Sequence, residues 1–125
     1  MDLTGARLAL ADLSNANLSG AMLKGSGLWR ANLSGSNLSK VDLCKASLEL
    51  ANLSGSNLSD ANLGLADMSK ADLSDANLSN ANLRGAEMLG AKCRNADFDR
   101  ATYNNMTIFP YRFNPVKRGM RKAES

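Results

Sequence analysis

The sequence has no histidine, two cysteines, two prolines and six aromatic residues among its 125 residues. Without histidine, imidazole metal sites and the catalytic triads of serine and cysteine hydrolases are excluded, together with the commonest general base at neutral pH. Cys44 and Cys93 are too few for a disulfide framework and too far apart for a zinc motif, so we expect two free thiols. These absences predict a protein that is not an enzyme and that uses no metal and no cofactor.

Long hydrophobic runs are also missing, and the chain as a whole is too polar for a membrane span. Asp2 and Arg7 interrupt the start of the sequence, where the apolar part of a secretory signal would need an unbroken run. We therefore expect a cytoplasmic protein.

The net charge of +3 is unevenly distributed along the chain. Residues 1–105 contain ten Lys or Arg and eleven Asp or Glu, whereas residues 106–125 contain five Lys or Arg and one Glu. This change predicts a nearly neutral domain at 1–105 and a basic C-terminal capping tail at 106–125. A short basic run is usually solvated, so we expect neither nucleic acid nor a membrane to be a partner.

A five-residue repeat fills the first segment. From Leu3 to Tyr103 every fifth residue is apolar, and sixteen of these twenty-one central positions are Leu. The residue two before the centre is usually Ala, and the residue one before it is Asn or Asp at fourteen sites. The consensus is Ala-(Asp/Asn)-Leu-Ser-X, in which X is Gly, Asn or Asp at thirteen sites.

This period fits neither a helix nor a straight strand. On a helix, at about 100° per residue, successive centres would rotate by roughly 140°, and in a strand they would alternate between the two faces. The chain must therefore turn once in every repeat. In a short extended stretch Ala and Leu point inward with Asn or Asp outward between them, while Ser and X suit a turn.

Matches between longer segments of the sequence indicate how many sides each turn of the coil has. Residues 31–40 and 51–60 differ only at their last position, and residues 11–20 closely resemble residues 71–80. A period of twenty is four repeats, so the pattern predicts an all-β, four-sided coil of about five turns, each rising about 4.8 Å. The predicted core centres of this coil include Leu13, Leu33, Leu53, Leu73 and Phe98.

The tandem units ADLSN-ANLSG, ANLSG-SNLSK and ADLSD-ANLSN resemble those of the pentapeptide-repeat family, and the resemblance covers residues 1–105. It implies a right-handed quadrilateral β-helix, a solenoid. The tail fragment TIFPYRFNPVKRGM is similar to C-terminal elements that often close such proteins in cyanobacteria, which suggests a cyanobacterial source.

The same resemblance suggests more than one possible function for the chain. Some members of the family resemble duplex DNA in shape and charge and bind DNA gyrase. Such mimicry needs a strongly acidic rod, because phosphates carry a dense negative charge, whereas residues 1–105 are nearly neutral. We therefore expect a rigid scaffold or protein-interaction module. The alternatives are gyrase binding and binding of nucleic acid or membranes by the basic tail.

The outward positions depart from the consensus most often on two of the four sides. Trp29 follows a centre, and its neighbours near the same corner in adjacent turns are Leu10 and Leu50. With Arg30 and Glu49 they form the candidate interaction surface, because clustered exposed apolar groups mark partner sites. Single exposed hydrophobic residues are also normal on protein surfaces, and that alternative stays open.

The other two sides carry polar columns. One of them consists of Asn17, Asn37, Asn57, Asn77 and Asp97. We expect these amides to hydrogen-bond along the column and so to stabilise the coil. The alternative is a flat polar surface that orders water or ice.

The two ends of the coil differ in their predicted cover. At the C-terminal end the residues expected to cover the core are Phe98, Tyr103, Ile108, Phe109 and Phe113. We expect one short helical turn at 116–121. At the other end the repeat begins at Leu3, so we expect either self-association through this uncovered end or an upstream segment.

Overall fold

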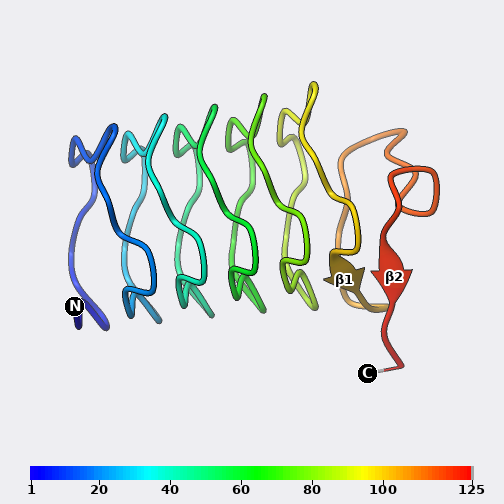
Figure 1. Cartoon of the computed structure of the whole chain (residues 1–125), viewed down its shortest axis with the longest axis horizontal. Coiled ribbons are helices and arrows are strands. Elements are labelled where there is room, and N and C mark those ends of the chain that lie inside the picture. Colours follow the sequence, from blue (N-terminus) through cyan, green and yellow to red (C-terminus); the bar gives the residue numbers. More distant parts are fainter. Residues whose placement is uncertain (125) are drawn as a thin grey trace.

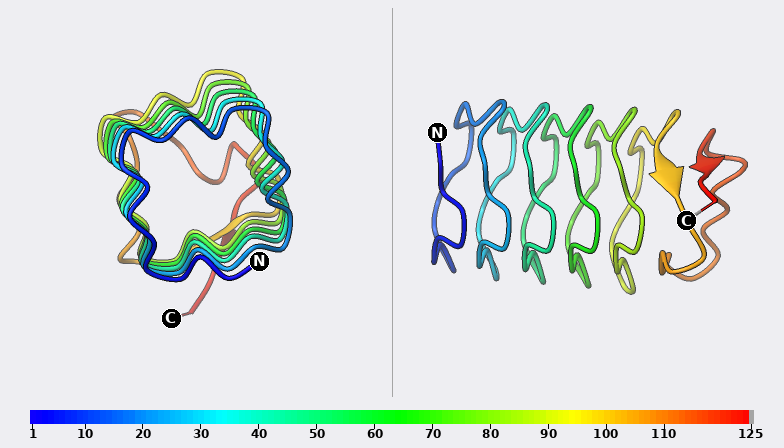
Figure 2. Two further views of the ribbon diagram at one scale, coloured as in Figure 1. Left: turned by 90° about the vertical axis from the view of Figure 1, so that its left-hand side faces the viewer. Right: turned by 90° about the horizontal axis from the view of Figure 1, so that it is seen from below.

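The computed structural model describes residues 1–124, which wind into a right-handed β-helix with four faces (Figure 1). Viewed along the axis, the successive turns superimpose as a square (Figure 2). No helix occurs within the described part of the chain. The all-β quadrilateral fold predicted from the repeat is confirmed.

Backbone pairing connects residues that are twenty positions apart. Parallel bridges join each residue one before a centre to its counterpart in the next turn, as far as Asn82↔Thr102. Around Asn52, for example, Leu33 N–H donates to Asn52 O at 2.7 Å and Asn52 N–H donates to Ala31 O at 2.9 Å. Each inner turn is therefore bonded to the turns on both sides, and each face presents one short extended stretch per turn.

At every corner the chain passes through a residue in the left-handed region. Each fifth residue from Gly5 to Arg100 has a φ between +55° and +76°. The turn closes when the next repeat donates to the preceding centre, as Ala31 N–H does to Leu28 O at 3.0 Å. Positive φ at the third residue is typical of type II turns, which favour Gly and Asn. Leu, Lys, Arg and Asp also occupy these corners, but no Val, Ile or Thr does, because a branched Cβ is crowded there.

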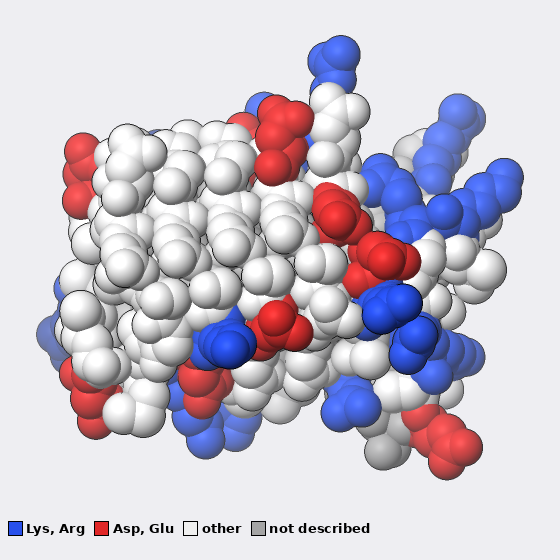
Figure 3. Space-filling model, in the orientation of Figure 1, with Lys and Arg blue, Asp and Glu red and all other residues white. Residues whose placement is uncertain are grey.

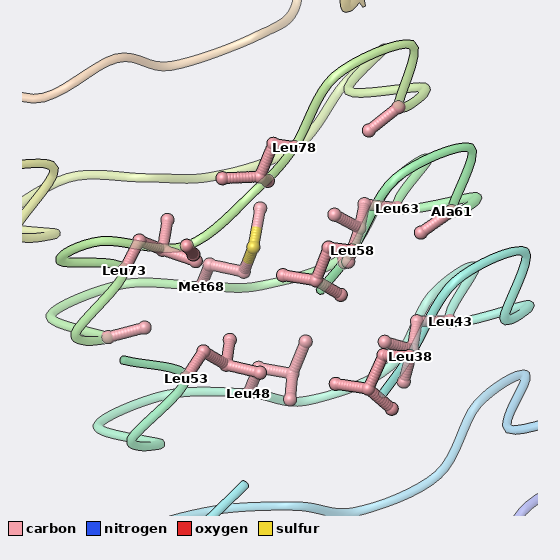
Figure 4. Close-up of a cluster of buried hydrophobic side chains, with 14 of the residues drawn as sticks. Leu38, Leu43, Leu48, Leu53, Leu58, Ala61, Leu63, Met68, Leu73 and Leu78 are labelled. Atoms are coloured by element: carbon pink, nitrogen blue, oxygen red, sulfur yellow. The ribbon is translucent and has the colours of Figure 1, made fainter. Parts of the chain in front are cut away.

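Leucine side chains from the four faces meet on the axis and fill it (Figure 4). Four of the five predicted core centres are at most 1% exposed, namely Leu33, Leu53, Leu73 and Phe98. Leu13, like Leu3 and Leu8, is only partly buried, because the first turn is packed on one side only. Fully burying a leucine side chain contributes about 1.5–3 kcal/mol, so the stacked centres are the main apolar contribution to stability.

The outward Asn and Asp side chains complete the hydrogen bonding of the backbone. In each repeat the backbone N–H of the residue that follows the centre has no backbone acceptor. The Oδ1 atom two residues earlier accepts it instead, as when Ser54 N–H donates to Asn52 Oδ1 at 3.0 Å. All fourteen Asn or Asp residues at this position make the same bond. The consensus Asn or Asp therefore satisfies the one backbone N–H of each repeat that the hydrogen bonds between successive turns leave unpaired.

The polar columns stabilise the coil in a different way from the one predicted. Within residues 1–124, one amide bonds to another along a column, from Asn82 Nδ2 to Asn62 Oδ1 at 3.0 Å. In the column of Asn37 and Asn57, each Oδ1 accepts the serine N–H two residues further along its own turn. The predicted bonding along that column is wrong, because no amide nitrogen of the column donates to the next oxygen and each oxygen bonds within its own turn instead.

Two short strands close the C-terminal end of the coil. β1, Thr102–Tyr103, and β2, Arg121–Lys122, pair in parallel, with Thr102 opposite Arg121 (Figure 1). The tail thus returns to the face on which β1 lies and adds most of a sixth turn. The helical turn predicted at 116–121 is wrong, because residues 115–119 form turns without a helix and Arg121 lies in β2.

One extra residue shifts the register before Ile108. Ile108 pairs with Glu87 rather than lying over the centre Met88, so it points outward and is 46% exposed. Phe109 takes the central position and packs against the core. The predicted role of Ile108 as cover is therefore wrong. Met120, which the sequence pattern did not single out, is buried instead.

Aromatic rings cover the C-terminal end of the core. Phe113 lies edge-on to Phe98, with ring centroids 5.1 Å apart, and stacks on Phe109 at 4.9 Å. The guanidinium carbon of Arg118 lies 4.8 Å from the Phe113 ring centroid, and its Nη2 donates to Cys93 O at 3.4 Å. The tail crosses the open square at this end (Figure 2), so these contacts fix it as a cap.

Both cysteines are free thiols, as predicted. Cys44 follows a centre on an outer surface, whereas Cys93 occupies a central position beneath the cap. Burial raises the pKa of the Cys93 thiol to about 11, although the Arg118 charge acts in the opposite direction. Because the thiolate is the reactive form, Cys93 should be unreactive at neutral pH.

Leu53→Ala should lower the free energy of unfolding by about 2–5 kcal/mol, because it removes buried methyl groups and leaves a cavity on the axis. Chemical denaturation followed by circular dichroism measures the loss. Leu65→Ala is the matched control, since Leu65 is a corner leucine that is 51% exposed. Its truncation should cost less than about 1 kcal/mol. Equal losses for the two variants would contradict the placement of Leu53 in the core.

Asn37→Ala should lower the free energy of unfolding by about 0.5–1.5 kcal/mol. The reason is that Ser39 N–H, which lies 3.1 Å from Asn37 Oδ1, loses its acceptor. Asn37→Asp keeps the oxygen and should retain most of the stability in the same denaturation experiment. A loss in the Asp variant as large as in the Ala variant would show that the amide nitrogen matters instead.

Removing part of the cap should activate Cys93. In a Cys44→Ser background, the reaction of Cys93 with a disulfide reagent at pH 8 should be slow, and Phe113→Ala should accelerate it at least about tenfold. The spectrophotometric rate measures this, with circular dichroism to confirm that the variant is folded. If Cys93 in the intact chain reacts as fast as Cys44, the cap does not shield it.

Candidate protein-interaction face

The four faces of the coil differ in their outward residues. The Trp29 face comprises residues 6–10, 26–30, 46–50, 66–70 and 86–90. The Asn57 face comprises residues 16–20, 36–40, 56–60, 76–80 and 96–100. Both faces keep the same backbone register. The outward position before the centre is always Asn or Asp on the Asn57 face, but on the Trp29 face only Asp67 fits this rule.

The Trp29 face lacks most of the side chains that satisfy the outward N–H groups. The residues in place of Asn or Asp are Arg7, Gly27, Ser47 and Glu87. The N–H groups that consequently have no acceptor within residues 1–124 are those of Ala9, Trp29, Glu49 and Leu89. This face omits local bonds that the Asn57 face keeps, and such a departure from a stabilising pattern is typical of a functional surface.

Exposed apolar side chains gather on the same face. Trp29 is 43% exposed, Leu50 is 41% exposed and Leu10 is 67% exposed. Leu89 and Ile108 extend the row toward the C-terminal end. The Asn57 face carries no exposed large hydrophobic residue among its described positions. The Trp29 face therefore carries more exposed apolar side chains than the Asn57 face, while Met22 and Leu65 are exposed on a neighbouring face.

The structure brings the five predicted surface residues together across three successive turns. Leu10 N–H donates to Trp29 O at 2.9 Å, and Arg30 N–H donates to Glu49 O at 3.0 Å. The guanidinium carbon of Arg30 lies 5.0 Å from the centroid of the Trp29 ring, so a cation covers part of the indole. Leu50 occupies the same corner column as Arg30, one turn further on. Together they form a continuous patch.

Two carboxylates adjoin this patch on its C-terminal side. The Asp67 carboxylate is the main reason that the pKa of Glu49 is raised, with partial burial second and the Glu87 charge a further contribution. The positions of Asp67 and Glu87 could have been predicted from the sequence, because the twenty-residue period places both in the column next to that of Glu49. No comparable signal existed for Ile108, because its position depends on the one-residue shift in the tail.

The described part of the chain contains neither a pocket nor a cluster of metal-binding side chains. Residues 1–124 contain no pocket, and no group of three or more His, Cys, Asp or Glu side chains among them could hold a metal ion. No helix in this range is both long enough and apolar enough to cross a membrane. The chemistry of the Trp29 face lies in its outward side chains.

Comparison with known proteins gives a family and several structural neighbours. The family model described as pentapeptide repeats matches residues 1–30, 28–64 and 66–102. No curated protein matches the chain.

Two cyanobacterial crystal structures are similar to this chain. The pentapeptide repeat protein Rfr23 from Cyanothece 51142 is 31% identical, with a TM-score of 0.74 over 74% of this chain and 63% of that one. HetL, a protein involved in heterocyst differentiation regulation from Nostoc sp. strain PCC 7120, is 30% identical, with a TM-score of 0.63 over 82% of this chain and 59% of that one. This chain thus corresponds to less than two thirds of the length of either relative.

A third neighbour is QnrB1, a plasmid-mediated fluoroquinolone resistance protein. It is 16% identical, with a TM-score of 0.51 over 98% of this chain and 80% of that one. At this identity the likeness shows the fold alone. The family model, however, matches most of the residues in which the five-residue repeat forms the coil. This chain therefore belongs to the pentapeptide repeat family.

Proposed function

We propose that this chain is a rigid, non-enzymatic protein-interaction module whose binding surface is the Trp29 face. One observation carries the proposal: exposed apolar side chains and missing Asn or Asp acceptors coincide on the same face. Apolar groups gathered in this way are typical of surfaces that bind another protein.

Trp29 is the expected anchor of the interface. Tryptophan and arginine are the residue types that most often dominate binding energy, and here Arg30 lies against the Trp29 ring. Leu10 and Leu50 occupy the same corner on either side of Arg30, so a partner that covers the ring also removes water from both leucines. The hydrogen bonds between successive turns already fix the backbone beneath these side chains. Little conformational entropy is therefore lost when a partner binds.

The charges on this face restrict the chemistry of the partner. Arg7 and Arg30 lie in the N-terminal half of the face, whereas Glu49, Asp67 and Glu87 lie beyond them together with one cation, Lys70. A complementary protein would place acidic groups opposite Arg30 and basic groups opposite Glu49. Because the Asp67 carboxylate raises the pKa of Glu49, a cation bound there would relieve repulsion between the two acids.

Gyrase binding through DNA mimicry has less support. Residues 1–105 contain ten Lys or Arg and eleven Asp or Glu, whereas a surface that imitates duplex DNA needs a large excess of negative charge. The likeness to QnrB1 concerns the fold and supplies no shared surface. We therefore place gyrase binding below a protein interaction through the Trp29 face.

Site-specific photocrosslinking tests the proposal. A photoreactive amino acid at Ser69, on the Trp29 face, should capture a discrete protein from an extract of the source organism, and the same group at Ser59, on the Asn57 face, should not. Trp29→Ser should reduce the capture at least about tenfold, because loss of an aromatic anchor typically costs about 2 kcal/mol or more.

Met22→Ser is the control for this experiment. Met22 is 46% exposed but lies outside the Trp29 face, so its substitution should leave capture unchanged. Equal capture from Ser69 and Ser59, or capture that survives Trp29→Ser, would overturn the assignment of the face.

A further inference from the structure

Positive charge gathers at the C-terminal end of the rod. Residues 92–124 contain eight Lys or Arg and three Asp or Glu, a net charge of +5, whereas residues 1–91 contain seven and nine. In Figure 3 more Lys and Arg side chains are visible at this end than elsewhere, with several Asp and Glu side chains beside them. The rod is therefore strongly polarised along its axis.

Folding of the tail assembles this charge from two parts of the sequence. The last complete turn contributes cations that the tail lies against, and Arg100 N–H donates to Gly119 O at 2.9 Å. Arg118 is used inside the cap, over the Phe113 ring. The seven other cations are all exposed: Lys92, Arg94, Arg100, Arg112, Lys117, Arg121 and Lys122.

Apolar side chains are exposed among these cations. Tyr111 is 85% exposed and Val116 is 72% exposed. Each adjoins a cation, since the guanidinium carbon of Arg112 lies 5.4 Å from the Tyr111 ring centroid and Lys117 follows Val116. The turn at Val116 is closed by Gly119 N–H, which donates to its carbonyl at 3.1 Å. The cap therefore presents basic and apolar groups on an ordered surface.

We propose that residues 92–124, the basic cap, bind the surface of an anionic lipid bilayer. The exposed cations would lie in the negative potential of the headgroups, while Val116 and Tyr111 would enter the boundary between headgroups and acyl chains. The strength of binding to a membrane surface increases with the apolar area that is buried and with the electrostatic attraction to anionic lipids, and the cap supplies both contributions. Apart from Ile108, none of the residues of the basic cap belongs to the Trp29 face, so the inference goes beyond the proposed protein interaction.

Nucleic acid fits the basic cap less well. Single strands bind along a basic groove in which successive bases stack on several aromatic rings. Tyr111 is the only fully exposed aromatic residue in the described cap, and the exposed Val116 and Met106 side chains have no role against phosphates. The inference departs from the solvated tail expected from the sequence, because folding adds the cations of the last turn to those of the tail at one end of the rod.

Vesicle co-sedimentation of the full chain tests the inference. We expect binding to phosphatidylcholine vesicles that contain about 30% phosphatidylserine, and none to phosphatidylcholine alone. The double variant Lys117→Glu/Lys122→Glu should lower the partition coefficient at least about 25-fold, since each cation at an anionic surface is worth roughly a factor of five. Val116→Ser should lower it severalfold without any change of charge.

The matched control is Lys40→Glu/Lys45→Glu, which changes the net charge equally at exposed corners of the body. It should bind like the unaltered chain, and circular dichroism checks that all variants are folded. Absence of binding to the anionic vesicles, equal losses in the two double variants, or no effect of Val116→Ser would overturn the inference. So would preferential binding to an oligonucleotide in competition with the vesicles, which would reassign the cap to nucleic acid.

Discussion

The parallel hydrogen bonds between residues twenty apart are the constraint on which the whole structure depends. They place each leucine centre over the centre of the next turn, and they fix which side chains share a column. A shift of one residue exchanges inward and outward positions. Ile108 shows this directly, because the extra residue before it moves its side chain to the surface and gives the core to Phe109.

The outward residues divide between stability and binding. On the Asn57 face each outward amide or carboxylate oxygen accepts the N–H that the ladder leaves over, so the consensus side chain has a fixed structural task. The Trp29 face gives up this bond in four of its five turns. Side chains released from that task can vary, and Arg7, Gly27, Ser47 and Glu87 occupy the positions made free. Trp29 and Glu49 are residues whose N–H groups consequently lack the acceptor. The same backbone thus supports one side with a regular structural pattern and one side with different chemistry.

The ends of the rod add a second division. The aromatic cap covers the core, buries Cys93 and uses Arg118 as an internal clamp, while the remaining cations stay outside. The proposed protein surface begins in the first three turns, and the proposed lipid surface lies at the opposite end. A rigid ladder between them would hold a bound protein at a defined distance and orientation from a bilayer.

The sequence by itself determined the four-sided coil, the core column through Leu33, Leu53 and Leu73, and the grouping of Leu10, Trp29 and Leu50. It could do so because inward alternation and turn chemistry are written into every repeat, and a fixed period converts local geometry into position along the axis. Only the tertiary structure decided that Asn37 bonds within its own turn, that Ile108 faces outward and that the tail brings Arg121 and Lys122 back over the last turn of the coil. These features depend on how the tail packs against the last turn and on which donors the ladder leaves unpaired, and no local pattern encodes either.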